Sequence, residues 1–217
     1  MQPPPTFHFL TILHLNASPK PHIVLLYMDD MGYGDIGCFG STKNRTPAID
    51  QMASEGMRFT DFYVTSGVCT PSRASLLTGC YPRRVNLHLD QNDKWVLFPN
   101  ARKGLNPSET TIAEILKKQG YATACIGKWH LGDQPEFLPT NQGFDSYFGI
   151  PYSNDMGRKN IPLTLLRDEQ DIEAPTIQEP ITRRHTEEAT SFIKHHPPTP
   201  NLLHPAPYTH ITLPTNR

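Results

Sequence analysis

The stretch SETTIAEILKKQGYATACIG, residues 108–127, decides the fold class of the chain. Ser108, which opens it, is a good helix N-cap because its hydroxyl can accept a hydrogen bond from an unpaired backbone N–H group. Apolar residues then recur at helical spacing, and a glycine follows them, which predicts a helix over Glu109–Gln119. The apolar run Tyr121–Ile126 predicts a strand directly after this helix.

The same alternation precedes this stretch. The run His22–Asp30 is apolar, rich in branched residues and ends in charge, which indicates a buried strand of a parallel sheet. Three elements are expected next: a helix over 47–56 with Ile49 and Met52 on its inner face, a second strand over 57–63, and a helix that follows Cys69 and ends near Gly79. Alternating strands and helices favour an α/β fold with a mainly parallel sheet flanked by helices.

The remaining segments define three expected regions. Residues 1–21 read as a leader or flexible arm, and residues 22–194 as the folded part, with a long loop over 80–107. From 143 to 184 the chain reads mostly as loop, followed by a helix around 187–194. Residues 195–217 are rich in proline and histidine and are expected to form an irregular tail, because proline opposes a central strand.

Composition excludes several classes of protein. The net charge of −1 leaves no basic surface for nucleic acid. No apolar run is long enough to span a membrane. The four cysteines, Cys38, Cys69, Cys80 and Cys125, show no paired zinc spacing. The apolar start at 7–15 contains histidines and lacks a basic flank, so it is not a clear signal peptide.

Cys69-Thr70-Pro71-Ser72-Arg73 carries the strongest chemical signal. A helix start supplies unpaired N–H groups and a positive dipole end, which suit a sulfate or phosphate. Pro71 suits the first helical position because its missing N–H would be unpaired there. Arg73 adds a permanently charged fork of donors.

Two further segments fall at the carboxyl ends of predicted strands, where ligands of open α/β sheets bind. Asp29 and Asp30 offer hard oxygens that suit Ca²⁺ or Mg²⁺. In the segment 127–132, GKWHLG, Lys128 offers a compact positive charge, and His130 can exchange a proton near neutral pH.

Together these segments resemble the type I sulfatases, including the arylsulfatases and the N-acetylgalactosamine-6-sulfatases. The resemblance covers about residues 22–194 and rests on the ordered Asp-Asp, Cys-x-Pro-Ser-Arg and Gly-Lys-Trp-His-Leu-Gly motifs. It implies an alkaline-phosphatase-like fold. It also implies a formylglycine made by oxidation of Cys69, with Asp29, Asp30 and residue 69 at a calcium ion, for which magnesium is the alternative.

The resemblance further implies the reaction of a sulfuric ester hydrolase acting on aryl or carbohydrate sulfates. A hydroxyl of hydrated formylglycine attacks the sulfur, the alcohol leaves, and sulfate is expelled as the aldehyde re-forms. Arg73 and Lys128 would offset charge on the sulfuryl oxygens, and His130 would orient or deprotonate a hydroxyl. Ser153 corresponds to a serine near the sulfate, although a turn role is an equal alternative.

His210, in the tail, is a candidate for a further histidine near the sulfate; the alternative is a tail that packs nowhere. The family's second part, with an Asp-Asn pair that completes the calcium site and a second sulfate-binding lysine, has no counterpart after His130. The chain is therefore expected to be incomplete at its C-terminus. The alternatives are a truncated, inactive sulfatase-like fragment or a phosphatase or phosphonate hydrolase of the same superfamily.

The family also implies partners and a location. The expected partners are a sulfate-ester substrate and a formylglycine-generating or other sulfatase-maturing enzyme, with no nucleic acid and no membrane span. The expected location is extracytoplasmic: secreted, lysosomal or periplasmic.

Overall fold

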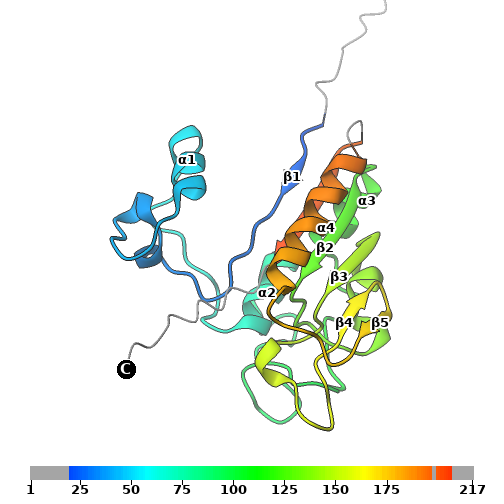
Figure 1. Cartoon of the computed structure of the whole chain (residues 1–217). Coiled ribbons are helices and arrows are strands. Elements are labelled where there is room, and N and C mark those ends of the chain that lie inside the picture. The colour runs from blue at the N-terminus through cyan, green and yellow to red at the C-terminus, as the bar shows by residue number, and fades with distance from the viewer. Residues whose placement is uncertain (1–19, 197–198, 207–217) are drawn as a thin grey trace, which may run out of the picture.

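The protein folds around one mainly parallel sheet (Figure 1). The computed structural model describes residues 20–196 and 199–206. Within them the strands are β1 (Ile23–Val24), β2 (Ala122–Gly127), β3 (Ser146–Gly149), β4 (Leu165–Arg167), β5 (Gln170–Glu173) and β6 (Asn201–Ala206). Their order is β1-β6-β2-β3-β4-β5; β1, β6, β2 and β3 are parallel, and the hairpin of β4 and β5 continues the sheet antiparallel to β3. The α/β class is confirmed.

Helices cover both faces of this sheet: α2 (Cys69–Thr78) and α3 (Ile112–Lys118) pack on one face, and α4 (Ile181–His195) packs on the other. A further helix, α1 (Pro47–Glu55), stands away from the sheet. Short 3-10 turns occupy Tyr33–Asp35, Gly37–Phe39, Pro135–Phe137, Pro139–Gln142 and Asn154–Met156. In Figure 1, α4 lies across β2 on one face. This arrangement encloses the core between the central strands and the helices.

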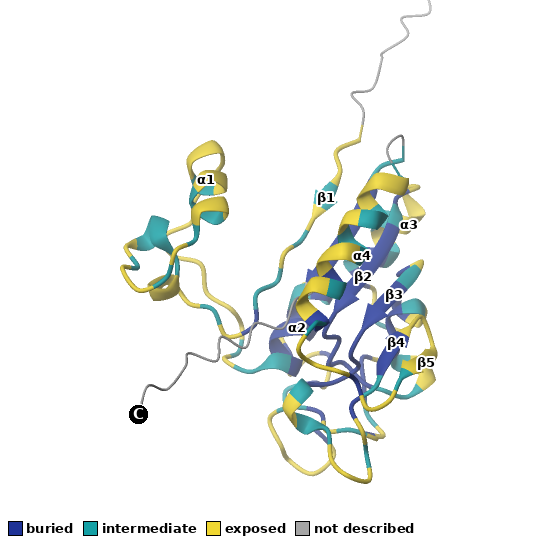
Figure 2. Cartoon of the chain, viewed as in Figure 1, coloured by how far each residue is buried: buried dark blue, intermediate teal, exposed yellow. Residues whose placement is uncertain are grey.

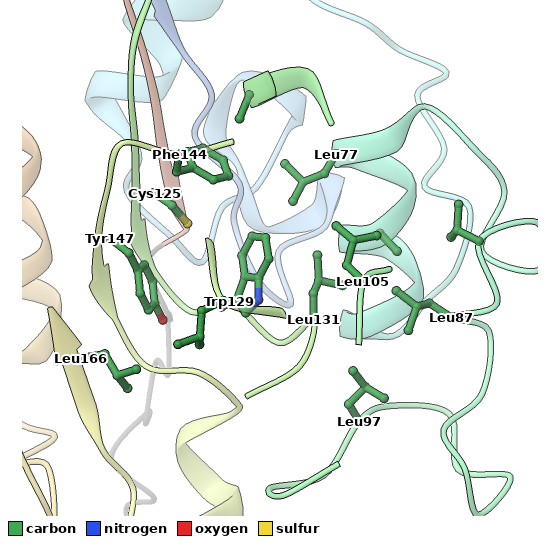
Figure 3. Close-up of a cluster of buried hydrophobic side chains, with 14 of the residues drawn as sticks. Leu77, Leu87, Leu97, Leu105, Cys125, Trp129, Leu131, Phe144, Tyr147 and Leu166 are labelled. Carbon is green, nitrogen blue, oxygen red and sulfur yellow. The ribbon is translucent and has the colours of Figure 1, made fainter. Parts of the chain in front are cut away.

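Alternation along the strands divides the core into two clusters. Cys125 of β2 and Leu202 of β6 pack with α2 and α3 residues, and the aromatic side chains of this cluster are drawn in Figure 3. Their neighbours Ala124 and Leu203 belong to the second cluster, with Phe192 of α4 packed against it. Successive strand residues point to opposite faces, so each central strand contributes to both clusters.

The predicted helix and strand over residues 109–126 are confirmed, but the N-cap is wrong. The helix begins at Ile112, and Thr111 is its N-cap. The Thr111 hydroxyl accepts from the Glu114 N–H at 3.1 Å, and the Glu114 carboxylate accepts from the Thr111 N–H at 2.8 Å. This reciprocal capping box satisfies two donors, whereas Ser108 lies in the preceding turn.

The proline-rich segment corrects a second prediction, because β6 is a central strand between β1 and β2. The carbonyl of Pro205 accepts from the Tyr27 N–H at 3.0 Å. The missing Pro205 N–H therefore falls on the side of the short edge strand β1 and leaves the ladder to β2 intact. Residues 207–217, including His210, lie outside the described residues.

The N-terminal elements are less buried than the sequence predicts. Val24 and Leu26 are 48% and 52% exposed, because β1 is paired only with β6 in the described chain. The predicted α1 forms, but Met52 on its supposed inner face is 59% exposed. Residues 57–63 form no strand. Figure 2 shows the α1 region standing away from the sheet with mostly exposed residues.

Two predictions at the C-terminal side also need correction. The segment 143–184 contains β3, β4 and β5 rather than mostly loop. The helix predicted over 187–194 begins six residues earlier, at Ile181. The segment 80–107 lacks regular structure as expected, but it buries Leu87, Leu97 and Leu105 in the core. Among the described residues, no helix has the length and apolarity that a bilayer crossing requires.

Candidate functional site

The candidate site lies where the carboxyl ends of the parallel strands meet the start of α2. A cleft of about 300 Å³ is lined there by residues that include Asp29, Asp30, Cys69 and Ser72. Asp29 and Asp30 follow β1, and residues 69 and 72 belong to the first turn of α2. The fold therefore brings the Asp-Asp and Cys-x-Pro-Ser-Arg motifs together, as expected for a site at this edge of an open α/β sheet.

Cys69 is the first residue of α2, and Val68 is its N-cap. Pro71 is thus the third helical residue rather than the first as predicted. It still lies in the first turn, where its missing N–H leaves no helical hydrogen bond unmade. The helix ends at the left-handed Gly79, as predicted (φ 67°). Its start directs the remaining unpaired N–H groups and the positive dipole end toward the cleft.

Lys128 connects the residues of the site. Its Nζ donates to Asp29 Oδ2 at 2.7 Å, to Cys69 Sγ at 3.1 Å and to Ser153 Oγ at 3.3 Å. Lys128 follows the last residue of β2, Gly127, whose φ of 112° suits glycine. The Lys128 side chain is only 1% exposed. A buried ammonium beside a thiol is suited to hold an anionic group at residue 69.

Asp29 is held ionised by two cations. Arg73 lies 3.1 Å and Lys128 2.7 Å from its Oδ2. Burial alone would raise the pKa of Asp29, but the charges and hydrogen bonds of Arg73 and Lys128 outweigh it and lower the pKa below the ordinary value. With one carboxylate and two cations, this buried group carries excess positive charge.

Tyr27 is a site residue that the sequence analysis missed. Its ring lies 5.0 Å from the Arg73 guanidinium, and its hydroxyl lies 2.6 Å from Ser72 Oγ. The Arg73 Nη1 atom also donates to the Lys128 carbonyl at 2.6 Å. Tyr27 and Asp29 are two residues apart near a strand end, and this period-2 spacing is the signal that predicts a shared face.

His130 lies in an adjacent part of the site. Its Nε2 donates to the Leu97 carbonyl at 2.8 Å, and Thr70 Oγ1 donates to the His130 carbonyl at 3.0 Å. Burial, with the charge of Lys128, lowers the pKa of His130 to about 3, so the ring is neutral. Its buried Nδ1 has no hydrogen-bond partner in the described structure and keeps a free lone pair. Among the described residues, the hydrogen bonds of this ring do not include one to Cys69.

The remaining predicted site residues do not all join the site. Ser153 joins the site through Lys128. Asp30 is exposed and adopts a left-handed backbone conformation (φ 56°). Asp30 also has no ion pair within the described chain. His210 is outside the described residues.

The donors present do not make a complete calcium site. Nowhere in the described residues do three or more His, Cys, Asp or Glu side chains gather for a metal ion. Asp29 Oδ2 is already engaged by Lys128 and Arg73. Calcium takes six to eight oxygen ligands, and the described chain offers the carboxylates of Asp29 and Asp30.

The sulfatase family profile matches residues 21–209 of this chain. The chain belongs to the sulfatase family. It is 52% identical to human arylsulfatase A over 145 residues, which are 66% of this chain and 28% of that protein. It is 39% identical to human N-acetylgalactosamine-6-sulfatase over 209 residues, which are 83% of this chain and 38% of that protein.

A solved structure gives the same result at the level of the fold. The crystal structure of Ps i-CgsB matches with a TM-score of 0.76 and 30% identity, covering 89% of this chain and 46% of that one. The alkaline-phosphatase-like fold implied by the sequence motifs is therefore confirmed for this chain. The chain spans less than half the length of each of these three relatives.

Proposed function

We propose that this sulfatase hydrolyses aryl or carbohydrate sulfate esters, with Cys69 as the precursor of a formylglycine. The observation that carries the proposal is the position of Cys69 Sγ, 3.1 Å from Lys128 Nζ at the start of α2. In a hydrated formylglycine, two hydroxyl oxygens on Cβ would replace this sulfur. Membership of the sulfatase family supports the assignment of the reaction class.

Formylglycine would supply two hydroxyls on one carbon, one to attack sulfur and one whose deprotonation releases sulfate. Lys128 and Arg73 would offset the negative charge that develops on the sulfuryl oxygens. Electrostatic stabilisation of this kind is usually the largest single contribution to catalysis. Both cations are buried, so water screens them little. The Ser153 hydroxyl, 3.3 Å from Lys128 Nζ, would bind a sulfate oxygen.

His130 would orient a formylglycine hydroxyl as a neutral ring. Because burial and the charge of Lys128 lower its pKa to about 3, the ring is neutral at physiological pH and is a weak base, which favours the orienting role over deprotonation. Nε2 is committed to the Leu97 carbonyl, which leaves the Nδ1 lone pair to accept a hydrogen bond. The hydrogen bond to Leu97 fixes the tautomer that this role requires.

Calcium, with magnesium as the alternative, belongs to the proposal through Asp29, Asp30 and residue 69. These residues alone fall short of the ligands that calcium takes, so further oxygens would come from outside the described residues. The proposed partners are a sulfate-ester substrate and a sulfatase-maturing enzyme that oxidises Cys69. The proposed location is extracytoplasmic.

The test is to produce the chain together with a formylglycine-generating enzyme and to identify the aldehyde in the Cys69 peptide by mass spectrometry. Release of sulfate from a chromogenic aryl sulfate is then measured. We expect Cys69→Ala to abolish release, and the matched variant Cys38→Ala, at a thiol on the α1 side, to retain it. Soluble protein that contains the aldehyde but releases no sulfate would refute the proposal.

A specific observation favours a second candidate, a non-catalytic sulfatase-like fragment that binds sulfate without turnover. The chain covers only 28% of human arylsulfatase A, and its described residues hold an incomplete metal site. Sulfate binding by the aldehyde-containing protein without ester hydrolysis would support it. The phosphatase alternative is disfavoured by the cysteine at position 69 and predicts release of phosphate instead of sulfate.

A further inference from the structure

We propose that Trp95 forms a subsite for the sugar ring of a sulfated carbohydrate, beside the proposed sulfate site. The inference rests on the proposed function and narrows its substrate class. Trp95 is 71% exposed, whereas the other tryptophan of the chain, Trp129, is 1% exposed. An indole left largely in water provides a wide apolar face on which a ring can stack.

The loop that carries Trp95, residues 90–97 (the Trp95 loop), is held in place by hydrogen bonds. The Asp90 carboxylate accepts from the Asn92 N–H at 2.6 Å and from the Lys94 N–H at 2.8 Å. The Asp90 N–H donates to the Lys94 carbonyl at 2.7 Å. These bonds hold the turn that immediately precedes Trp95. A preordered platform loses little conformational freedom when a ligand binds, so more of the contact energy contributes to affinity.

The same loop is tied to the candidate site. The Leu97 N–H donates to Thr70 Oγ1 at 3.1 Å, and the Leu97 carbonyl accepts from His130 Nε2 at 2.8 Å. Thr70 directly follows Cys69 in α2. Trp95 is two residues from Leu97, so their Cα atoms are at most about 7 Å apart. The backbone that carries the exposed indole therefore lies close to Thr70, the residue after the proposed nucleophile, although Trp95 is not among the residues that line the cleft itself.

The two parts of a sulfated sugar suit two parts of the site. The Trp95 indole offers an apolar face to the ring, and the loop itself adds no net positive charge, because Asp90 and Asp93 accompany Lys94. A sulfated sugar combines an apolar C–H face with negative charge. Lys128 and Arg73 would take the reacting sulfate, while Trp95 would take the ring. An aryl ring shares the stacking chemistry, and the experiment separates the two.

Tryptophan fluorescence provides the measurement, because Trp129 is buried and changes in quenching by acrylamide report on Trp95. The probes are galactose 6-sulfate, phenyl sulfate, galactose and inorganic sulfate, each titrated into the aldehyde-containing protein. We expect galactose 6-sulfate to protect Trp95 from acrylamide, and inorganic sulfate to bind without such protection. Calorimetry with the same probes gives affinities that do not depend on fluorescence.

Three variants complete the test. We expect Trp95→Ala to weaken galactose 6-sulfate binding about fivefold to tenfold and to leave inorganic sulfate binding unchanged. Trp95→Phe keeps a stacking face and should retain most of the affinity. The matched control is Tyr81→Ala, which removes an aromatic side chain that is 74% exposed just beyond the opposite end of α2. Its affinity should equal that of the unaltered chain.

Each other outcome decides against the proposal in a distinct way. Equal galactose 6-sulfate affinity in the Trp95→Ala variant would refute the Trp95 subsite and leave the proposed sulfate site standing. Dependence on Trp95 for phenyl sulfate but not for galactose 6-sulfate would refute the sugar class. If the unaltered chain binds neither galactose 6-sulfate nor inorganic sulfate, the proposed function and the subsite are both wrong.

Discussion

At the scale of single residues, Lys128 links chemistry with stability. Its ammonium is buried against Asp29, Cys69 and Ser153. Arg73 supplies a second cation to the same carboxylate. Removing one member of a buried ionic group leaves the others imperfectly compensated, because water cannot replace the lost partner. The site should therefore tolerate substitution poorly even before catalysis is considered.

The Lys128→Met variant tests this point. It keeps an apolar stem and removes the buried donor to Asp29, Cys69 and Ser153, while Asp29 stays paired with Arg73. We expect the free energy of unfolding to fall by about 2 kcal/mol, because the lost hydrogen bonds are buried. The control Lys117→Met removes the exposed pair with Asp145, whose N–O distance is 2.8 Å, and should cost less than about 1 kcal/mol. Urea denaturation measures both. Similar losses for the two variants would contradict the burial argument.

At the scale of elements, Thr111 and Ser108 are the two possible N-caps of α3. Thr111 forms the capping box with Glu114, and its hydroxyl also donates to the Gln142 carbonyl at 2.8 Å. Thr111→Ala should lower the free energy of unfolding by about 1–2 kcal/mol. Ser108→Ala should leave it within about 0.5 kcal/mol, because Ser108 lies outside the helix. A larger loss for Ser108→Ala would show that the helix begins earlier.

The inner face of α4 carries a buried histidine that should make the free energy of unfolding depend on pH. Burial, with the charge of Arg184, lowers the pKa of His185 to about 4 from its ordinary 6.5. The folded state therefore binds this proton less readily than the unfolded state. The neutral His185 ring therefore makes its full contribution to the free energy of unfolding above pH 6.5. This contribution is lost as the pH falls toward 4, with about 2 kcal/mol lost by pH 5.

His185→Leu should remove this share of the acid sensitivity, because the ring nitrogens of His185 have no hydrogen-bond partners in the described structure. Urea denaturation at pH 7 and pH 5 should show a smaller difference for the variant than for the unaltered chain. His204, whose pKa burial also lowers to about 4, keeps its own contribution in both proteins. An unchanged difference would rule out His185 as its source.

At the scale of the whole molecule, one side of the sheet is open in the described chain. Val24 and Leu26 on the β1 side are half exposed, and Phe59, Phe62 and Tyr63 beside α1 are more so. A groove of about 740 Å³ runs between these apolar segments. Unpaired strand edges with apolar side chains promote association between molecules.

We therefore expect the isolated chain to self-associate as its concentration rises. The double variant Val24→Lys and Leu26→Lys places charges on this edge and should shift the chain toward the monomer in sedimentation measurements. A control with two lysines on the exposed face of α4, at Thr186 and Thr190, adds the same charge elsewhere. Equal effects would attribute the change to net charge alone.

The sequence by itself determined the reaction-bearing motifs and the α/β alternation. The candidate site residues follow strand ends or lie near the start of a helix; they are Cys69, Arg73, Lys128 and the two aspartates. These local signals depend on residue order and short-range periodicity. The helices α1 and α2 were predictable for the same reason, because a proline near the start and a glycine at the end mark each of them.

Tertiary structure alone decided how these parts meet. The central position of β6 depends on which side of the strand Pro205 leaves without a donor, and no local pattern specifies that. The ring of Tyr27 over Arg73 and the anchoring of the Trp95 loop through Leu97 join segments far apart in sequence. Such contacts arise from packing across the sheet, whereas a sequence pattern reports only neighbours along the chain.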